Sequence, residues 1–562
     1  MRAATNDDGD AVLVVDNLTV DLPPDGDRRH AVEGVSFTLG AREILCIVGE
    51  SGSGKSLTAQ AIMGLLPGPH VRASAGSIRF EGRDLLRLGE PELRAIRGAR
   101  IGMIFQEPMT ALNPVMRIGD QIAEVLRFHG RRKAPAGRIV ELLAAVGLPD
   151  PETLRHVYPF RLSGGQRQRV MIAMALALDP AILIADEPTT ALDVTTQAQI
   201  LALIRSIQAA RNMAVLFITH DFGVVAEIAH RVAVMHEGRL VEIGPTAEVL
   251  NAPRHDYTRR LLGAVPRLLP RRPRAIAPGP PLLAVENLRK TFITSAGWFR
   301  PKRITEAVKD VAFEVRAGET MGIVGESGSG KSTVARCLVR LIEADRGSVA
   351  VAGIPGDFLH LRPAALRTQR RKVQIIFQDP YASLNPRRSV GDIIAQGPIA
   401  HGEPPAAVHR RVRELLALVG LDPASAERYP HEFSGGQRQR IGIARALALE
   451  PRLLVADEPV SALDVSVQAQ VLELLENIRR RLGLAMIFIT HDLRVAAQVC
   501  DNVAVMCAGE IVEYGATAEV LIHPRHDYTR QLLASIPGRN WASPADRAAT
   551  GDTNRAYQGI RT

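Results

Sequence analysis

Short apolar runs, separated by longer segments of mixed polarity, dominate the hydrophobic pattern of the chain. Runs typical of buried strands lie at residues 44–49 (ILCIVG), 181–186 (AILIAD) and 214–219 (AVLFIT). Residues 55–66, which follow the first run after a glycine-rich loop, have the apolar spacing of a helix. Short apolar strands that alternate with helices favour a parallel sheet covered on both faces. The pattern therefore predicts an α/β fold.

One longer segment has helical periodicity and lacks such strands. It covers residues 107–175, and a similar segment covers residues 380–447. We interpret each as a helical subdomain that is inserted into the α/β core.

An internal repeat explains why these segments occur twice. Most of the repeated motifs return after 271 residues, as SGGQ does at 163 and at 434. The recurring motifs are GESGSGKS at 49–56 and 325–332, IFQEP at 104–108 and IFQDP at 376–380, SGGQRQR at 163–169 and 434–440, ADEP at 185–188 and 456–459, FITHD at 217–221 and 488–492, and PRHDYTR at 253–259 and 524–530. The chain therefore contains two copies of one domain.

The repeat also predicts the domain boundaries. The two domains are expected at residues 11–264 and 282–536. Between them, residues 265–281 are rich in Pro and Arg and have no apolar period, which is typical of a semi-rigid, extended linker. A basic patch that contacts lipid or RNA is the alternative for this linker. We expect residues 1–10 and 537–562 to be disordered.

Composition narrows the class of protein. Of the 562 residues, 46% are hydrophobic and 23% are charged, which excludes a wholly disordered or fibrous chain. The net charge of +9 permits nucleic acid or anionic lipid as a partner, but arginine spread over the surface explains it as well. The four cysteines are scattered, which suits a reducing compartment and predicts neither a disulfide framework nor a zinc or iron–sulfur site.

No targeting or membrane-spanning segment is predicted. Acidic residues near the start of the chain stand where a secretory signal has basic residues. The nearest apolar candidate, residues 170–178, ends at Asp179 and Pro180. It falls short of the ~18–20 residues that span a bilayer. Any membrane role must therefore depend on partner chains.

Both copies of GESGSGKS have the complete pattern of a phosphate-binding loop that follows a strand and opens a helix. Glycines let backbone N–H groups turn toward phosphate oxygens, and the helix N-terminus adds positive charge. The lysine would reach the β- and γ-phosphates, and the last serine would bind Mg²⁺. The predicted nucleotide-binding residues are Gly49, Ser51, Gly52, Ser53, Gly54, Lys55 and Ser56 in the first copy, and Gly325, Ser327, Gly328, Ser329, Gly330, Lys331 and Ser332 in the second.

Two adjacent acids end a buried strand in each copy. Asp186 and Asp457 would hold Mg²⁺ through water, and Glu187 and Glu458 would orient and polarise the attacking water. Neighbouring carboxylates at a strand end are costly without a cation to offset them. A solvated acidic loop is the alternative, which the phosphate loops disfavour.

The order of these motifs resembles the ATP-binding cassette of ABC transporters, over residues 12–263 and 283–535. SGGQ is the most specific part, because other phosphate-loop ATPases lack it. In the family, this signature opens a helix that caps the γ-phosphate held by the other cassette, with glycines that allow close approach. The resemblance implies two tandem nucleotide-binding domains, each with a RecA-like core and an inserted helical subdomain.

The resemblance also implies two composite sites for ATP and Mg²⁺, formed by intramolecular pairing of the cassettes. Gln106 and Gln378 would contact Mg²⁺ and the attacking water, and His220 and His491 would contact the γ-phosphate. The first site would combine the loop at 49–56 with Gln106, Asp186, Glu187, His220, Ser434, Gly435, Gly436 and Gln437. The second would combine the loop at 325–332 with Gln378, Asp457, Glu458, His491, Ser163, Gly164, Gly165 and Gln166.

One position departs from the family pattern. The family places an aromatic ring near the end of the first strand, where it stacks on adenine. Aligning the repeats puts Phe292 opposite Leu22. Stacking of a base on an aromatic ring contributes ~1–3 kcal/mol. We therefore expect the first site to bind ATP more weakly than the second.

The glutamine loops indicate a branch of the family. QEPMTALNP at 106–114, QDPYASLNPR at 378–387 and the PRHDYT ends are similar to the peptide and nickel importer branch. Within that branch, the chain is most similar to ATP-binding proteins of glutathione and oligopeptide importers that carry two fused cassettes. The contact with the membrane subunits would include Pro108, Met109, Pro380 and Tyr381, for which ordinary loop packing is the alternative.

Membership of this branch implies particular partners and a location. Two integral-membrane permease subunits and a periplasmic or lipid-anchored solute-binding protein are expected, and the chain would lie peripherally on the cytoplasmic face of the inner (cell) membrane. The solute stays open between peptides, glutathione and a non-peptide solute such as a nickel chelate.

A second class of protein also carries twin cassettes without membrane spans. Ribosome-associated translation factors have a long, charged helical arm between their cassettes, whereas this linker is short and rich in proline, which disfavours a helix. A DNA-repair ATPase would need zinc-binding cysteine clusters. No nucleic-acid partner is therefore expected.

Overall fold

The computed structural model describes residues 11–24, 28–106, 111–130, 135–190, 192–271, 274, 276, 279–294, 303–461 and 463–541. These residues form two compact units. The first unit holds residues 11–192, 196–265 and 537–541, and the second holds residues 193–195 and 266–536. No helix among the described residues is both long enough and apolar enough to cross a bilayer.

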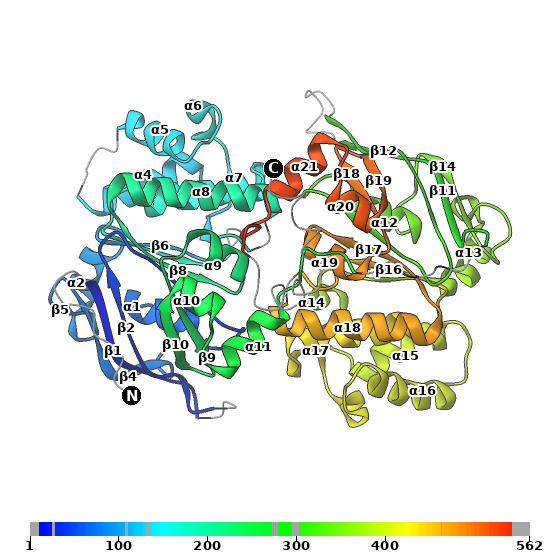
Figure 1. The fold of residues 1–562 in the computed structure, drawn as a ribbon, viewed down its shortest axis with the longest axis horizontal. Coiled ribbons are helices and arrows are strands. Elements are labelled where there is room, and N and C mark those ends of the chain that lie inside the picture. The colour runs from blue at the N-terminus through cyan, green and yellow to red at the C-terminus, as the bar shows by residue number, and fades with distance from the viewer. Residues whose placement is uncertain are drawn as a thin grey trace. The chain divides into compact units, whose positions relative to one another are not determined.

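The first unit contains ten strands and ten α-helices within the described ranges (Figure 1). The strands are β1 (Ala11–Asp21), β2 (His30–Gly40), β3 (Ile44–Val48), β4 (Arg72–Phe80), β5 (Arg83–Asp84), β6 (Ile101–Ile104), β7 (Ile182–Asp186), β8 (Ala214–Thr219), β9 (Arg231–His236) and β10 (Arg239–Pro245). The helices are α1 (Lys55–Met63), α2 (Glu90–Ile96), α4 (Ile118–Phe128), α5 (Ala136–Ala145), α6 (Pro151–Leu154), α7 (Gly164–Ala175), α8 (Val194–Arg211), α9 (Phe222–Ile228), α10 (Thr246–Asn251) and α11 (Asp256–Ala264).

The larger sheet of this unit has the strand order β10-β9-β3-β8-β7-β6. All its neighbouring strands pair in parallel except β9 and β10, which are antiparallel. Every residue of β3, β7 and β8 is buried, as expected for strands with helices on both faces. These strands coincide with the three predicted apolar runs. The predicted helix is α1, which ends where Gly64 adopts a left-handed φ of 61°.

A second, antiparallel sheet has the order β2-β1-β4-β5 and was not part of the sequence prediction. In β1 the buried positions are Leu13, Val15, Leu18 and Val20. The alternation is interrupted because Asn17 adopts a left-handed φ of 49° and shifts the register. This bulge hides the period of two that identifies a strand.

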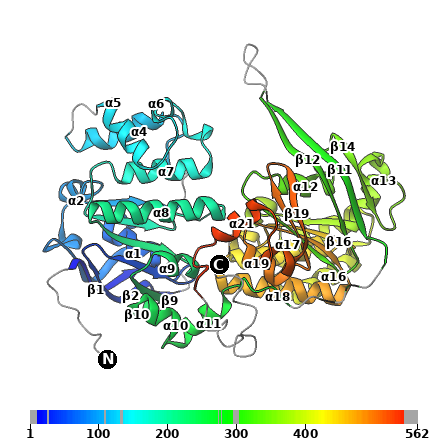
Figure 2. The same cartoon turned by 45° about the horizontal axis from the view of Figure 1, so that its top comes forward.

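The helical subdomain consists of α4, α5, α6 and α7. Figure 2 shows these helices on one side of α8 and the strands of the unit on its other side. Apolar residues of α4, α5 and α7, such as Ile122, Leu142 and Val170, belong to one buried cluster with residues of the larger sheet. The described part of the segment 107–175 is therefore helical, as predicted.

The second unit repeats this plan. Its strands are β11 (Leu283–Thr294), β12 (Arg303–Val315), β13 (Thr320–Val324), β14 (Arg346–Val351), β15 (Val373–Ile376), β16 (Leu453–Asp457), β17 (Ala485–Thr490), β18 (Asn502–Cys507) and β19 (Glu510–Ala516). Its helices are α12 (Lys331–Leu338), α13 (Pro363–Gln369), α14 (Pro380–Ser383), α15 (Val390–Ala400), α16 (Pro405–Leu418), α17 (Gly435–Leu447), α18 (Val465–Leu482), α19 (Leu493–Val499), α20 (Thr517–Ile522) and α21 (Asp527–Ala534). The sheet orders are β15-β16-β17-β13-β18-β19 and β12-β11-β14.

Glycines let the SGGQ helix of each unit approach the long helix that follows. A Cβ atom on Gly165 would lie 2.5 Å from Cγ2 of Thr196, at the start of α8. A Cβ atom on Gly436 would lie 2.3 Å from Cγ1 of Val467, at the start of α18. Both distances are shorter than packed carbon atoms allow. The second glycine of SGGQ is therefore a packing residue in both units.

We predict that Gly436→Ala destabilises the second unit by about 1–3 kcal/mol, because the added methyl group overlaps Val467 and forces either this side chain or α17 to shift. Gly435→Ala is the matched control, since the nearest atom to its Cβ would be 3.9 Å away. Thermal unfolding of the full-length chain should show a lower transition for Gly436→Ala only. Equal transitions for the two variants would contradict the packing role.

Candidate functional site

Each phosphate loop connects a central strand to a helix. In the first unit, β3 leads into residues 49–54, and α1 begins at Lys55. Gly54 precedes the helix with a left-handed φ of 102°, and a Cβ atom there would lie 2.6 Å from the carbonyl oxygen of Ala31. Gly330 has the same role in the second unit, with a φ of 105°. Only glycine fits this turn, which aims the first N–H groups of the helix toward a bound anion.

The lysine of each loop is buried and holds the loop closed. Lys55 is only 4% exposed, and its Nζ donates to the carbonyl oxygens of Gly49 and Glu50 at 2.8 Å each. Lys331 donates to the carbonyl oxygens of Gly325 and Glu326 at 2.8 and 2.7 Å. Burial lowers the pKa of Lys331, so its ammonium group is poorly solvated. A bound phosphate would add negative charge beside this poorly solvated ammonium group.

The serine after the lysine meets the aspartate at the strand end. Ser56 Oγ donates to Asp186 Oδ1 at 2.9 Å, and Ser332 Oγ donates to Asp457 Oδ1 at the same distance. Burial raises the pKa of Asp186 to about 6, although Ser56 opposes the shift. A buried carboxylate beside a hydroxyl is an oxygen donor set that suits Mg²⁺. The residues therefore fit the predicted magnesium site.

The glutamate after this aspartate adopts an unusual backbone conformation. Glu187 and Glu458 both have a left-handed φ of 47°, which is strained for a residue other than glycine. The side chain of Glu187 is fixed by Gln106 Nε2 at 3.1 Å and by Thr190 Oγ1 at 2.9 Å. The predicted glutamine and glutamate therefore meet within each unit, since Gln378 Nε2 donates to Glu458 Oε2 at 2.9 Å.

A histidine keeps each of these glutamates ionised. His220 Nδ1 lies 3.4 Å from Glu187 Oε1, and His491 Nδ1 lies 3.2 Å from Glu458 Oε2. Burial alone would raise the pKa of Glu187, but the hydrogen bonding and charge of His220 outweigh it and lower the pKa to about 2. The pKa of Glu458 is lowered in the same way. Both carboxylates can therefore accept a hydrogen bond from water at neutral pH.

The signature residues cap their own helices. Ser163 Oγ accepts from the backbone N–H of Gln166 at 3.2 Å, and Gln166 Oε1 accepts from the N–H of Ser163 at 3.0 Å. Ser434 and Gln437 form the same reciprocal cap at the start of α17. Gly164 and Gly435 occupy the first turn of α7 and α17, where a Cβ atom would make only an ordinary leucine contact at 3.8 and 3.9 Å, unlike at Gly165 and Gly436. The expected contact of these residues with the γ-phosphate of the other unit stays a prediction.

A tyrosine that sequence reasoning missed supports each phosphate loop. The hydroxyl oxygen of Tyr257, from α11, accepts from the backbone N–H of Glu50 at 3.4 Å. Tyr528, from α21, accepts from the N–H of Glu326 at 3.2 Å. The recurrence of PRHDYTR was the available signal, but its link to a loop about 200 residues earlier cannot be read from the sequence.

The two units differ where an adenine ring would stack. Phe292 lies near the end of β11, is 38% exposed and has Lys290 Nζ 5.6 Å from its ring centroid. Leu22 follows β1 and packs against the core of the first unit. In the first unit, the Arg28 guanidinium instead donates to the carbonyl oxygen of Gly52 in the phosphate loop. The predicted aromatic ring is therefore available in the second unit only, among the described residues.

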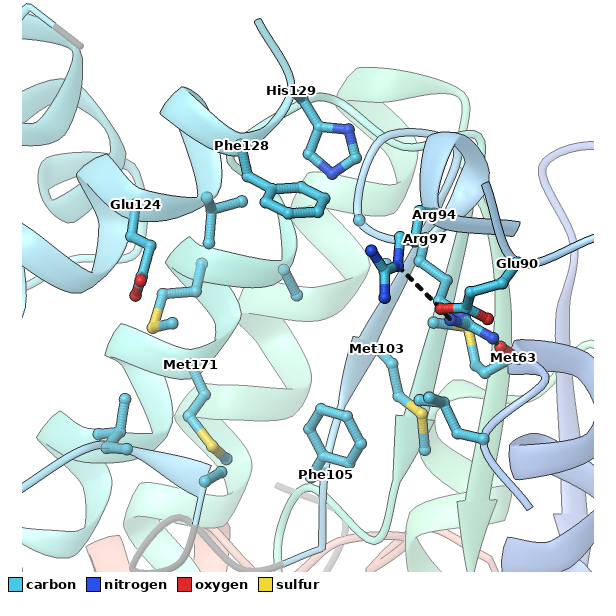
Figure 3. Close-up of a pocket in the computed structure, with 18 residues that line it drawn as sticks. Met63, Glu90, Arg94, Arg97, Met103, Phe105, Glu124, Phe128, His129 and Met171 are labelled. Atoms are coloured by element: carbon cyan, nitrogen blue, oxygen red, sulfur yellow. Dashed lines mark hydrogen bonds and ion pairs between the residues drawn. The ribbon is translucent and has the colours of Figure 1, made fainter. Parts of the chain in front are cut away.

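An apolar groove of about 510 Å³ lies beside the glutamine of the first unit. It opens between α1, α2 and β6 on one side and α4 and α7 on the other (Figure 3). Met103, Phe105, Phe128 and Met171 line it, and Phe105 directly precedes Gln106. Both phenylalanine rings are exposed. Such a groove fits an apolar segment of another chain.

Four residues of the glutamine loops were predicted to contact the membrane subunits, and the structure describes two of them. Pro108 and Met109 lie outside the described residues. Pro380 opens α14, and Tyr381 is 66% exposed, with the Arg438 guanidinium 3.7 Å from its ring centroid.

We predict that Asp186→Asn stabilises the ligand-free chain at pH 7–8. Because folding raises the pKa of this carboxyl from 3.8 to about 6, its ionisation opposes folding, and the penalty grows as the pH rises through that window to roughly 2–3 kcal/mol. The apparent Tm of the variant should exceed that of the parent at pH 8, and the gain should shrink toward pH 5. Asp256→Asn, at an exposed aspartate of α11, is the control. A gain that is independent of pH would contradict the assignment.

Comparison with known proteins identifies the family to which the chain belongs. A family model described as ABC transporter matches residues 32–190 and 308–461, and one described as oligopeptide/dipeptide transporter, C-terminal region, matches residues 241–290 and 512–557. The glutathione import ATP-binding protein GsiA of Shigella dysenteriae serotype 1 is 48% identical over 563 residues, which cover 94% of this chain and 90% of that protein. GsiA of Escherichia coli strain K12 gives the same values.

Among solved structures, a dimeric post-hydrolysis state of the ATP-binding cassette MJ0796 bound to ADP and Pi is similar over 42% of this chain and 98% of that chain, with 28% identity and a TM-score of 0.38. The family model covers more than half of the chain, and its matches contain both phosphate loops and both acidic strand ends. The chain therefore belongs to the ABC transporter family, as an ATP-binding protein with two cassettes in one polypeptide.

Proposed function

We propose that this chain hydrolyses ATP to drive the import of peptides, of the di- or oligopeptide or glutathione type. It would act with two separate membrane permease subunits and a solute-binding protein, from the cytoplasmic face of the inner membrane. The observation that carries the proposal is the similarity to glutathione import proteins over 94% of the chain, and the predicted glutamine and glutamate, which are hydrogen-bonded in both cassettes, support it. The peptide-transporter match of both C-terminal regions supports the same substrate class over a nickel chelate.

The residues of each cassette support hydrolysis by water. The loop N–H groups and Lys55 would bind the β- and γ-phosphates, and the ionised Glu187 would accept a hydrogen bond from a water molecule placed in line with the γ-phosphorus. The water oxygen bonds to phosphorus as the bond to the bridging oxygen breaks, and ADP and phosphate leave. Ser56 and Asp186 would hold Mg²⁺, which would offset negative charge on the phosphate oxygens.

The second half of each site is proposed to come from the opposite cassette. Ser434, Gly435, Gly436 and Gln437 would complete the first site, and Ser163, Gly164, Gly165 and Gln166 the second. The serine side chain of each signature accepts a hydrogen bond from the backbone N–H of the glutamine at its own helix N-terminus. A γ-phosphate there would take over some of the N–H groups that these side chains now occupy.

The groove beside Phe105 is proposed as the docking site of one permease subunit. The repeat places Gly442 and Arg445 of the second cassette at the positions of Met171 and Met174. Arg445 is half-buried, donates to the carbonyl oxygen of Ser383 and lies 5.7 Å from the ring centroid of Phe377. The first cassette therefore has two methionines where the second has a glycine and an arginine, so the two permease subunits should differ.

We predict that ATP binds more tightly to the second cassette than to the first. Glu187→Gln and Glu458→Gln would slow hydrolysis in one site each, and ATP titration of each variant would report the two affinities. The second site should be favoured by up to ~1–3 kcal/mol, because Phe292 can stack on adenine and Leu22 cannot. Introducing Leu22→Phe should narrow the difference. Equal affinities in the two sites would contradict the stacking argument.

The proposed function is tested by purifying the tagged chain from gently solubilised membranes. We expect two multi-spanning proteins and a solute-binding protein to be recovered with it. Phe128→Asp should reduce their recovery severalfold, since it places a charge in the apolar groove. Leu482→Asp, at an exposed leucine that ends α18, is the matched control. Recovery of ribosomal proteins without membrane partners would overturn the transport function and leave the ATPase chemistry intact.

A further inference from the structure

Two arginines of the signature helix reach the glutamine loop of the second cassette. Arg438 and Arg445 are seven residues apart on α17, which is about two helical turns, so both lie on the same face of the helix. The loop that they contact begins at Gln378 and includes the short helix α14. All of these residues belong to the second unit. The contacts between them therefore lie within one cassette.

Arg445 contacts the loop on both sides of Gln378. Its Nη1 donates to the carbonyl oxygen of Ser383, which ends α14. Its guanidinium group lies 5.7 Å from the ring centroid of Phe377, the residue before Gln378. Burial lowers the pKa of Arg445, because its cation is poorly solvated by water and depends on these protein contacts. One side chain therefore ties down both ends of the segment that carries the glutamine.

Arg438 lies beneath the ring of Tyr381. Its guanidinium carbon is 3.7 Å from the ring centroid, and its Nε and Nη2 donate to the carbonyl oxygens of Pro430 and His431 at 2.6 and 3.2 Å. Its Nη1 is buried and has no hydrogen-bond partner among the described residues. The face of an aromatic ring attracts a cation that water does not reach. Tyr381 therefore supplies a contact that this buried guanidinium needs, and the contact holds α14 against α17.

These contacts fix the backbone around Gln378. This residue is exposed, so packing around its own side chain contributes little to its position. Its Nε2 nevertheless donates to Glu458 Oε2 at 2.9 Å, and this glutamate is the residue expected to polarise the attacking water. The hydrogen bond requires that the loop stays close to the end of β16. The two arginines hold the loop from α17 and so keep the glutamine within reach of the carboxylate.

The first cassette has a different residue at the position of Arg445. The repeat places Met174 there, and it places Ala111 at the position of Ser383. Both residues line the apolar groove of the first unit. A methionine has no N–H group to donate, so it cannot form the bond to the loop carbonyl. The chain itself therefore provides the substitution that removes this contact without removing an apolar, half-buried side chain.

We infer that Arg445 and Tyr381 are positioning residues for ATP hydrolysis. They hold the glutamine loop of the second cassette on its signature helix and thereby keep Gln378 in contact with its glutamate. Turnover by the second cassette should depend on them, whereas ATP binding, which the phosphate loop provides, should not. The inference goes beyond the proposed function, because it concerns the chain's own ATPase activity and requires no permease.

The first test measures how firmly the loop is held, by hydrogen exchange and mass spectrometry of the full-length chain. Arg445→Met should raise the exchange rate of the backbone amides of residues 379–383 severalfold, because α14 loses its bond to α17. Arg440→Met is the matched control, since Arg440 lies on the same helix but donates to Val419 and Gln470 instead. Unchanged exchange in Arg445→Met, or an equal rise in both variants, would overturn the inference.

The second test separates positioning from a general loss of structure, in variants that circular dichroism shows to be folded. Arg445→Met should lower kcat for ATP hydrolysis and leave KM for ATP unchanged. In the Glu458→Gln background the same substitution should lower kcat no further, because Gln378 then has no carboxylate to position. A rise in KM alone, or the same fractional loss of kcat in both backgrounds, would place the effect of Arg445 elsewhere and overturn the inference.

Conservative variants complete the design. Arg445→Lys keeps an N–H donor and should recover most of the turnover that Arg445→Met loses. Tyr381→Phe keeps the ring over Arg438 and should hydrolyse ATP faster than Tyr381→Leu, which removes it. Failure of both recoveries would contradict the assigned contacts. These measurements use the purified chain without permeases, so they stand apart from the membrane recovery that tests the proposed function.

Discussion

The acidic pair at the end of a buried strand is the constraint on which each cassette depends. Asp186 and Glu187 are shielded from water and adjacent, so both cannot be ionised without compensation from neighbours. Ser56 bonds the aspartate, while His220, Gln106 and Thr190 surround the glutamate. These neighbours come from α1 and from segments that follow β6, β7 and β8. The parallel order of the larger sheet is what brings the ends of these strands to one edge.

Backbone conformation also positions the residues of each site. The left-handed φ of Glu187 turns its carboxylate away from the course of the strand and toward the glutamine and histidine. Glycines at the phosphate loop and at the SGGQ helix permit contacts that a Cβ atom would block. Both features occur at equivalent positions in the two cassettes. The strain and the close packing are therefore properties of the motif rather than accidents of one copy.

The sequence correctly predicted those elements of the fold that depend on the local spacing of apolar residues. The three buried strands, α1 and the two helical subdomains follow from apolar runs and repeated motifs, and the meeting of Gln106 with Glu187 follows from the resemblance to the ABC family. The antiparallel sheet was missed because the bulge at Asn17 disrupts its alternation. The loop contacts of Tyr257 and Tyr528 were missed because their partners lie about 200 residues away in sequence. No local period in the sequence reports contacts between residues so far apart.

The unequal surfaces beside the two glutamine loops bear on how the transporter assembles. Two separate, identical cassettes could meet a pair of permeases in either of two arrangements. This chain has methionines at 171 and 174 in its first cassette and Gly442 and Arg445 at the equivalent positions of its second. A permease could therefore distinguish the two cassettes. Each half would then always face the same permease. Under the proposed docking, fusion of the cassettes would fix their stoichiometry and the divergence of their surfaces would fix their orientation, so that the site lacking the aromatic ring would always face the same permease.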